Sequence, residues 1–284
     1  MGKKTLNIYQ GGVSIITGGA SGIGLAFGKA LASKGCHVIL ADLQIELAEK
    51  QAELITSSGG KATAVSLDVR DSKGFKKLIE ETREAHGRID TLFNNAGVAV
   101  GWEVKDDLLE DWNYIIDVNI RGVVNGTLAV YPIMIEQGFG HIVNIASGAG
   151  LVPATGAVSY GMTKHAVVGL STSLRGQALE YGVRVSVVCP SFVDTPILKG
   201  GVYGRVDARV VKKLENAPKP SVTIGTSLLV RKVLPQIEKN RSIIVEPMNM
   251  KIMWWVYRLC PDFFLRLVTK GWFLIKKKLN LSVL

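Results

Sequence analysis

A doubly wound α/β fold, with helices on both faces of a seven-stranded parallel sheet, is the architecture that this sequence predicts. Short β-branched runs alternate along the chain with longer segments of helical period. The short runs are apolar at successive positions rather than at alternate ones, which is typical of strands buried on both faces. A chain of 284 residues with 47% hydrophobic content is also long enough to fill one large core.

The seven expected strands are VSIIT (13–17), HVILA (37–41), KATAVSL (61–67), IDTLFN (89–94), GHIVNIA (140–146), VRVSVVC (183–189) and RSIIVE (241–246). Helices are expected in the gaps, near residues 22–34, 43–57, 72–86, 107–137, 156–181 and 221–239. Because we find no internal repeat and no Ser/Pro-rich linker, residues 1–250 are expected to form a single domain.

One segment, residues 195–220, does not follow the alternation of strands and helices. It combines Gly200, Gly201 and Gly204 with Pro218, Pro220 and many charges, which indicates a loop. The loop follows the carboxyl end of a strand, where ligands bind in open α/β sheets, so we interpret it as a substrate lid. The alternative is a solvated surface insertion.

Composition limits the partners and the compartment. The net charge is +10, but residues 251–284 hold seven Lys/Arg and one Asp and therefore supply +6 of it. Because most of the positive charge belongs to this one segment, a nucleic-acid partner is not favoured. No run of 18 apolar residues and no amino-terminal apolar core occur, so we expect a cytoplasmic protein without a membrane span or secretory signal. Cys36, Cys189 and Cys260 match neither a disulfide framework nor a zinc site, and no metal is expected.

A glycine-rich loop, TGGASGIG (17–24), follows the first strand and opens the first helix. Glycines allow the backbone to approach a pyrophosphate closely, and the amino terminus of the helix offers unpaired N–H groups to the anion. Asp42 stands at the end of the next strand, where a carboxylate accepts hydrogen bonds from ribose hydroxyls. A 2′-phosphate would meet this negative charge, so NAD is favoured over NADP.

A phenol and an ammonium, Tyr160 and Lys164, are four positions apart in the sequence and therefore share one helix face. A cation near a phenol lowers its pKa from the usual value of about 10, so we expect Tyr160 to exchange protons near neutral pH. His165 is adjacent to Lys164 and points about 100° away around the helix, so we do not expect it to be catalytic.

Together with these motifs, NNAG (94–97), Asn119 and Ser147 occur in an order and spacing that resemble the short-chain dehydrogenase/reductase family. The resemblance covers about residues 10–248. It implies a Rossmann fold and four catalytic residues. Ser147 would bind the substrate oxygen and Tyr160 would be the general acid/base. Lys164 would bind the nicotinamide ribose and lower the Tyr160 pKa, and Asn119 would hold a water that links Lys164 to solvent.

The resemblance also implies which positions contact the cofactor. They lie on loops at the strand ends and on the catalytic helix: Gly18, Ser21, Gly22, Ile23, Gly24, Asp42, Asp68, Val69, Asn95, Ala96, Gly97, Tyr160, Lys164, Pro190, Val193 and Thr195. Asp68 and Val69 would flank the adenine, and Thr195 would lie near the nicotinamide carboxamide. The family often has Gly after the proline where this chain has Ser191, a departure that narrows the expected pocket or shifts the ring.

The expected substrate is a hydrophobic secondary alcohol or its ketone. The candidate pocket residues are mostly apolar, with no evident arginine to bind a carboxylate: Val98, Val100, Trp102, Leu151, Val152 and Phe192. The alternative function is a non-catalytic NAD(H)-binding or membrane-associated scaffold, which has no need of an activated phenol. By analogy with the family, we expect a homodimer or homotetramer.

The sequence leaves the usual family ending beyond Pro247, and residues 251–284 form a basic, aromatic extension that we expect to be helical. Its apolar runs are too short to span a membrane. Three interpretations remain open: peripheral membrane contact, closure over an apolar substrate, and packing against another subunit.

Overall fold

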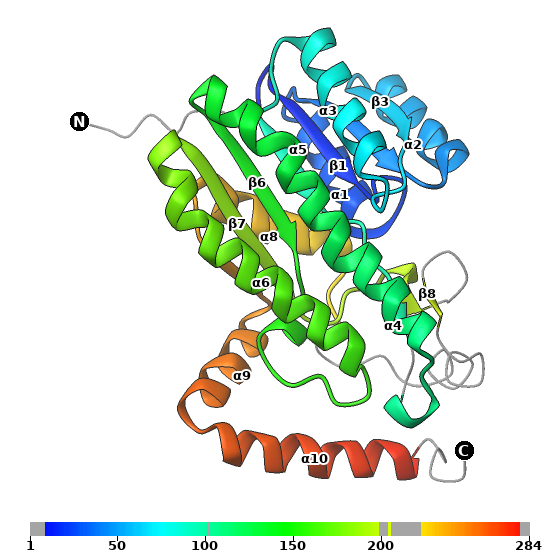
Figure 1. The fold of residues 1–284 in the computed structure, drawn as a ribbon, viewed down its shortest axis with the longest axis vertical. Helices are drawn as coiled ribbons and strands as arrows, with labels where there is room; N and C mark the ends of the chain where they lie inside the picture. The colour runs from blue at the N-terminus through cyan, green and yellow to red at the C-terminus, as the bar shows by residue number, and fades with distance from the viewer. Residues whose placement is uncertain (1–8, 101–102, 199–203, 206–222, 279–284) are drawn as a thin grey trace.

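The computed structural model describes residues 9–100, 103–198, 204–205 and 223–278, and it contains the expected seven-stranded parallel sheet (Figure 1). The strands are β1 (Val13–Thr17), β2 (His37–Asp42), β3 (Lys61–Ser66), β4 (Thr91–Asn94), β6 (Gly140–Ile145), β7 (Val183–Pro190) and β9 (Ile243–Glu246). Their order across the sheet is β3-β2-β1-β4-β6-β7-β9. The seven strand predictions are confirmed, each within two residues at either end.

Helices cover both faces of the sheet, as predicted. Their bounds are α1 (Gly22–Ala32), α2 (Ile45–Ser57), α3 (Ser72–His86), α4 (Leu109–Ile116), α5 (Gly122–Gln137), α6 (Val158–Ala178) and α8 (Thr226–Glu238). Helices α3, α5 and α6 pack with Ile15 and Leu92 on one face, while α1, α2 and α8 pack with Ile16 and Phe93 on the other. Neighbouring strand residues thus enter two different cores, which explains why the strand segments are apolar at successive positions.

The order of the strands reverses between β1 and β4, because the chain winds outward first on one side of β1 and then on the other. At such a switch point the loops beyond the carboxyl ends diverge and leave a crevice for ligands. The glycine-rich loop after β1 and the NNAG segment after β4 both lie there.

The predicted helix 107–137 is one long element with a short π-helical segment, Asp117–Arg121, between α4 and α5. Among the described residues, Leu109–Gln137 is the stretch with the length and composition of a membrane span, and half of its most apolar part is buried inside the protein. Insertions of this kind are common at functional sites, and this one contains Asn119.

A two-residue pairing of β5 (Ala99–Val100) with β8 (Gly204–Arg205) was not predicted, because such short strands have no periodicity to detect. The expected lid, residues 195–220, lies largely outside the described residues. Its described parts are β8 and a 3₁₀ turn, Pro196–Leu198.

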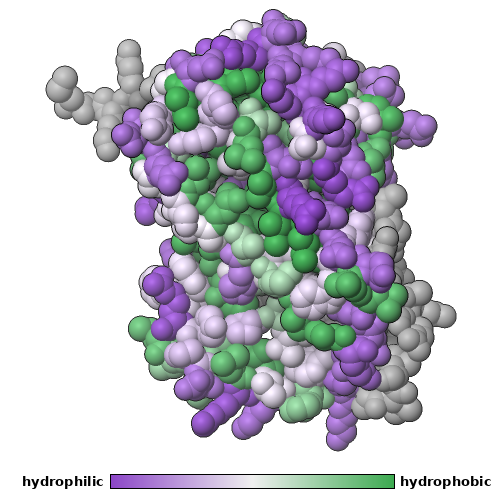
Figure 2. Space-filling model, viewed as in Figure 1, coloured by the Kyte–Doolittle hydropathy of each residue, from purple (hydrophilic) through white to green (hydrophobic). Residues whose placement is uncertain are grey.

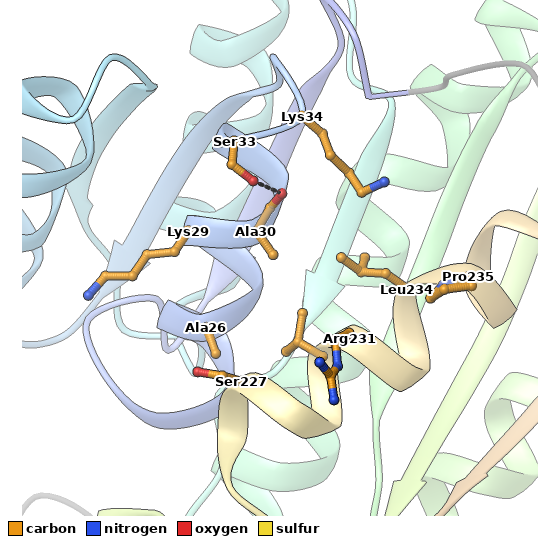
Figure 3. Close-up of a pocket in the computed structure, with 10 residues that line it drawn as sticks. Ala26, Lys29, Ala30, Ser33, Lys34, Ser227, Arg231, Leu234 and Pro235 are labelled. Carbon is orange, nitrogen blue, oxygen red and sulfur yellow. Dashed lines mark hydrogen bonds between the residues drawn. The ribbon is translucent and has the colours of Figure 1, made fainter.

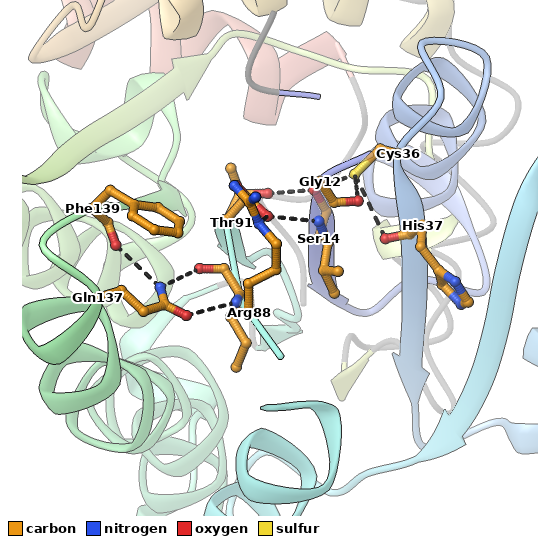
Figure 4. Close-up of polar contacts among 11 residues, drawn as sticks. Gly12, Ser14, Cys36, His37, Arg88, Thr91, Gln137 and Phe139 are labelled. Atoms are coloured by element: carbon orange, nitrogen blue, oxygen red, sulfur yellow. Dashed lines mark hydrogen bonds and ion pairs between the residues drawn. The ribbon is translucent and has the colours of Figure 1, made fainter. Parts of the chain in front are cut away.

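At the amino-terminal edge of the sheet, a polar network joins neighbouring strands (Figure 4). The Thr91 hydroxyl donates to Ser14 Oγ at 2.5 Å, and Ser14 Oγ lies 3.0 Å from Cys36 Sγ. Burial raises the pKa of the Cys36 thiol to about 11, so this cysteine is a protonated packing residue. Cys189 is buried as well, whereas Cys260 is exposed.

The carboxyl-terminal extension is helical, as predicted, and forms α9 (Met248–Leu259) and α10 (Pro261–Lys278). Both lie at the lower end of the molecule in Figure 1, below α6. Met250 and Phe264 are buried in a third apolar cluster together with Leu151, Val152 and Val187. The extension therefore packs on the domain next to the segment that follows β6.

Candidate active site

Ser147, Tyr160 and Lys164 come together beyond the carboxyl end of β6. Ser147 lies two residues after the end of β6, and its hydroxyl accepts a hydrogen bond from the Ala149 amide at 3.2 Å. Tyr160 and Lys164 lie one turn apart on α6, with the Lys164 Nζ 5.5 Å from the centre of the Tyr160 ring. Ser147 is also close enough to Tyr160 for its hydroxyl to favour the ionised form of the phenol. The three side chains therefore form one cluster, as the sequence predicts.

Lys164 is buried, and its Nζ donates to the Ile145 carbonyl oxygen at 3.0 Å. Burial lowers the pKa of Lys164 to about 8, because a buried ammonium loses its hydration. The amine is therefore charged at neutral pH but close to its titration point.

The pKa of Tyr160 is raised to about 12, chiefly by burial, while the hydrogen bond with Ser147 opposes this rise. The expectation of a pKa below 10 is therefore wrong for this structure. The physical reason is that the surroundings of the phenol desolvate it, which disfavours the phenolate. At neutral pH, Tyr160 is a protonated phenol that can donate a proton.

Asn119 is fully buried and makes three hydrogen bonds that hold two segments of the site. Its Oδ1 accepts from the Val98 amide at 2.8 Å, and its Nδ2 donates to the Val98 carbonyl at 3.0 Å and to Thr163 Oγ1 at 3.1 Å. A β-carbon at Gly97 would lie 3.3 Å from both Asn119 Oδ1 and Lys164 Nζ. Asn119 thus lies beside Lys164, where its contacts join the chain after β4 to α6.

The glycine-rich loop fits a pyrophosphate. Gly18 and Gly22 have φ values of +63° and +55°, which favour glycine. A β-carbon at Gly24 would lie 2.2 Å from the Gly18 carbonyl oxygen, so the loop closes tightly over the start of α1. Ser21 precedes α1 and makes no side-chain cap hydrogen bond, which leaves the first-turn amides of Gly22 and Ile23 for an anion.

Asp42 ends β2 beside this loop and is mostly buried. Its Oδ2 accepts from the Ala20 amide at 2.9 Å, and its Oδ1 accepts from the Gln44 amide at 3.0 Å. Each carboxylate oxygen keeps a further lone pair, so Asp42 can still accept from a ribose hydroxyl. The carboxylate thus both orders the loop and places a negative charge beside it.

Asn95 and Thr17 join β1 to β4. The Asn95 Nδ2 donates to the carbonyls of Thr17 at 2.8 Å and Gly18 at 3.2 Å. Thr17 Oγ1 accepts from the amides of Asn95 and Ala96, both at 3.0 Å. The sequence reasoning missed this role of Thr17, although its position directly before Gly18 was a usable signal.

Three further predicted cofactor positions follow strand ends, Asp68 and Val69 after β3 and Thr195 after β7. Asp68 binds Arg70, which lowers the pKa of this carboxyl, and Val69 is buried against Gly122. Thr195 lies against the loop, since a β-carbon at Gly22 would be 3.4 Å from Thr195 Cγ2.

Beyond Pro190, the chain continues to pair with neighbouring main chain, which holds it beside the crevice. The Ser191 amide donates to the Glu246 carbonyl at 2.8 Å, and Val193 forms a bridge with Ile224. The serine that replaces the expected glycine thus continues the pairing of β7 with β9.

The expected pocket residues divide into two groups. Val98, Val100, Leu151 and Val152 are buried, whereas Phe192 is exposed. Trp102 lies outside the described residues. The buried members contribute to the apolar clusters, so these four act at least in part as packing residues.

The extension supplies two further neighbours of the site that the sequence reasoning missed. A β-carbon at Gly148, next to Ser147, would lie 2.6 Å from the Met250 sulfur, and one at Gly156 would lie 2.4 Å from the Trp272 ring. Both glycines belong to the segment between Ser147 and Tyr160. Because more than 90 residues separate Ser147 from α10, no local pattern predicts this contact.

A surface groove of about 540 Å³ lies between α1 and α8 and is lined by Lys29, Lys34 and Arg231 (Figure 3). It contains none of the predicted catalytic residues. Within the described residues, no group of three or more His, Cys, Asp or Glu side chains is arranged to hold a metal ion.

A doubly wound sheet, a glycine loop at its switch point and a Ser/Tyr/Lys cluster beside that loop define a dinucleotide-dependent oxidoreductase. The short chain dehydrogenase family matches residues 12–202. Oxidoreductase UcpA of Escherichia coli K12 is 40% identical over 198 residues, which cover 69% of this chain and 73% of that protein. The chain therefore belongs to the short-chain dehydrogenase family.

Solved structures of similar proteins include different cofactors. A short-chain dehydrogenase/reductase from Burkholderia phymatum in complex with NAD has a TM-score of 0.82 at 28% identity, covering 90% of this chain and 95% of that one. A short-chain dehydrogenase from Sphingobium yanoikuyae in complex with NADPH has a TM-score of 0.75 at 25% identity, with the same coverage. Membership of the family thus indicates an NAD(P)-dependent oxidoreductase, with either nucleotide represented among its neighbours.

Proposed function

We propose that this protein interconverts a hydrophobic secondary alcohol and its ketone, using NAD(H). The observation that carries the proposal is the cluster of the Ser147 hydroxyl, the Tyr160 phenol and the buried amine of Lys164, whose Nζ lies 5.5 Å from the centre of the Tyr160 ring. Two hydroxyls that meet at one point can both bond a single carbonyl oxygen. A scaffold that only binds dinucleotide has no use for this arrangement.

In ketone reduction, Tyr160 donates its proton to the substrate oxygen while Ser147 holds that oxygen by a second hydrogen bond. The protonated state of the partly buried phenol suits this direction. Lys164 supplies a positive charge that stabilises the phenolate left behind. When bound, the nicotinamide supplies or accepts the hydride. In alcohol oxidation the proton moves in the opposite sense, to the phenolate oxygen of Tyr160.

NAD is the proposed cofactor because of Asp42. Its carboxylate lies beside the glycine loop, where it can accept from ribose hydroxyls and repels a 2′-phosphate. An apolar substrate is proposed because the segment between Ser147 and Tyr160 contains the apolar Leu151 and Val152 and is contacted by Met250.

The test is a screen of secondary alcohols and ketones, with and without cyclic apolar groups, that follows absorbance at 340 nm with NAD(H) and NADP(H) in parallel. We expect turnover with NAD(H) and higher kcat/KM for the more apolar substrates. Faster turnover with NADP(H) would overturn the cofactor assignment. If NADH binds but no compound turns over, the scaffold function is favoured instead.

The two directions are expected to respond differently to pH. Because the pKa of Tyr160 is raised to about 12, the phenolate required for alcohol oxidation is scarce at neutral pH and increases as pH rises. Oxidation should therefore accelerate by up to about tenfold per pH unit between roughly pH 6 and 9. Ketone reduction uses the protonated phenol, so its kcat/KM should not rise over this range. Initial rates in both directions measure this, and a parallel rise in both would contradict the assignment.

A further inference from the structure

Helix α9 presents a continuous apolar stripe to solvent. Met248, Ile252, Trp255 and Leu259 follow one another at spacings of four, three and four residues, and each is more than half exposed. This spacing places them along one face of the helix. Large apolar side chains on the surface of a monomer are ordinarily scattered, so a stripe of this kind marks a site of interaction.

The orientation of α10 is fixed by contacts on its inner side. Phe264 is buried in the third apolar cluster, and Trp272 lies against Gly156. Near the other end of the helix, Lys276 Nζ binds Glu103 Oε1 at 2.8 Å. These three positions hold one side of α10 against the domain, which leaves the opposite side facing outward.

The outward side of α10 carries both apolar and basic residues. Phe263, Leu267, Lys270, Leu274 and Lys277 follow one another at spacings of four, three, four and three residues, and all five are exposed. They therefore form a second stripe, in which ammonium groups lie between large apolar side chains.

Charge in the extension is almost entirely positive. Among residues 251–277, Asp262 is the acidic residue, whereas Lys251, Arg258, Arg266, Lys270, Lys276 and Lys277 are basic. Within the described part of the chain, Lys276 is the one of these six residues that forms an ion pair. In Figure 2, hydrophobic and hydrophilic side chains are interspersed at the lower end of the molecule, where α9 and α10 lie in Figure 1.

We propose that the outward faces of α9 and α10 bind the surface of a lipid bilayer that contains anionic headgroups. In that position the Lys and Arg side chains meet the headgroups while the phenylalanine, leucine and tryptophan side chains enter the acyl boundary. A cytoplasmic protein with such a surface binds the membrane peripherally, without spanning it.

Charge complementarity favours a lipid surface over a second copy of the chain. A twofold contact places the same patch on both subunits, so it would bring the basic residues of α10 close to those of its partner. The exposed Leu274 and Trp255 likewise gain nothing from a nucleic acid backbone, which would leave them in water. Anionic lipid satisfies both the apolar and the basic members of the stripes.

Membrane binding also has a consequence for the active site, which rests on the proposed function. Because Trp272 and Met250 lie against the segment between Ser147 and Tyr160, the docked face would bring this end of the enzyme to the bilayer. Hydrophobic alcohols and ketones concentrate there.

The experiment is cosedimentation of the full-length protein with vesicles of phosphatidylcholine, alone or mixed with phosphatidylserine, at low and high salt. We expect binding to the mixed vesicles, at least about tenfold weaker binding to phosphatidylcholine alone, and loss of affinity as salt rises. The double variant Lys270→Gln/Lys277→Gln should bind mixed vesicles at least about tenfold more weakly.

The apolar stripe is tested with Leu267→Glu/Leu274→Glu, which should no longer sediment with vesicles. Its matched control is Leu54→Glu/Leu128→Glu on α2 and α5, because the exposures of 48% and 68% match the 49% of Leu267 and 67% of Leu274. The control should bind vesicles like the unaltered protein. Circular dichroism confirms that both variants are folded.

Two outcomes overturn the proposal. One is equal sedimentation of the stripe variant and its control. The other is a protein that binds no vesicles and whose molar mass, measured by light scattering, falls in the Leu267→Glu/Leu274→Glu variant. That result would assign the face to contact with a second copy of the chain. NADH binding and turnover of a water-soluble ketone are measured separately, so failure of the proposed enzyme activity is distinguishable from failure of membrane binding.

Discussion

Replacement of Tyr160 by phenylalanine is expected to lower turnover by roughly a hundredfold to ten-thousandfold while NADH affinity changes little. The substitution removes the hydroxyl that we propose carries the transferred proton, but it keeps the ring that packs against the core. Ser147 alone can still hold the substrate oxygen. It does not provide a proton donor next to the Lys164 amine.

Steady-state rates at 340 nm and NADH fluorescence titration measure the two quantities separately. The matched control is Tyr181→Phe, a partly exposed tyrosine in a 3₁₀ turn after α6, which should retain full activity. Undiminished turnover in Tyr160→Phe would reject the acid/base assignment. Equal losses in both variants would indicate that the effect is structural.

Substitution of Gly24 by alanine is expected to weaken NADH binding by roughly 10- to 100-fold. The added β-carbon would lie 2.2 Å from the Gly18 carbonyl oxygen and 2.5 Å from Asn95 Nδ2, so the loop must move away from the start of α1. Overpacking of this kind costs about 1–3 kcal/mol, and each 1.4 kcal/mol corresponds to about tenfold in affinity. The loop would then no longer present its amides to a pyrophosphate.

Fluorescence titration with NADH checks the loss of affinity, and thermal unfolding shows that the variant is folded. Gly169→Ala is the matched control, because a β-carbon at this position in α6 has no neighbour within 4 Å. It should keep the NADH affinity and raise the stability by up to about 1 kcal/mol, since alanine is the better helix former. Unchanged affinity in Gly24→Ala would show that the loop does not hold the dinucleotide.

The sheet and its helices could be predicted because the pattern that specifies them is local. Each strand is buried on both faces, so its successive residues are apolar. Ile15 and Ile16 in β1 and Leu92 and Phe93 in β4 are examples, and such apolar runs are recognisable in the sequence. The site residues Ser147, Tyr160 and Lys164 were found because they belong to one strand end and one helix. Topology then brings them to the same edge of the sheet.

The features that escaped prediction depend on distant contacts or on solvation. The pairing of β5 with β8 involves two residues on each side, and the contact of Trp272 with Gly156 joins segments more than 100 residues apart. The pKa of Tyr160 was predicted in the wrong direction because the spacing from Lys164 indicates a neighbouring charge but not the loss of hydration. Asn119 was identified, but its hydrogen bonds to Val98 required the fold.

The packing of Trp272 on Gly156 makes α10 a neighbour of the segment that joins the predicted catalytic residues Ser147 and Tyr160. A version of the protein cut back to residues 1–250 therefore lacks a contact that this segment has in the full-length protein. The same contact makes α10 a place where relatives with the same catalytic residues can diverge in the molecules they accept. Changes in this helix can shift the segment between Ser147 and Tyr160 without replacing either residue.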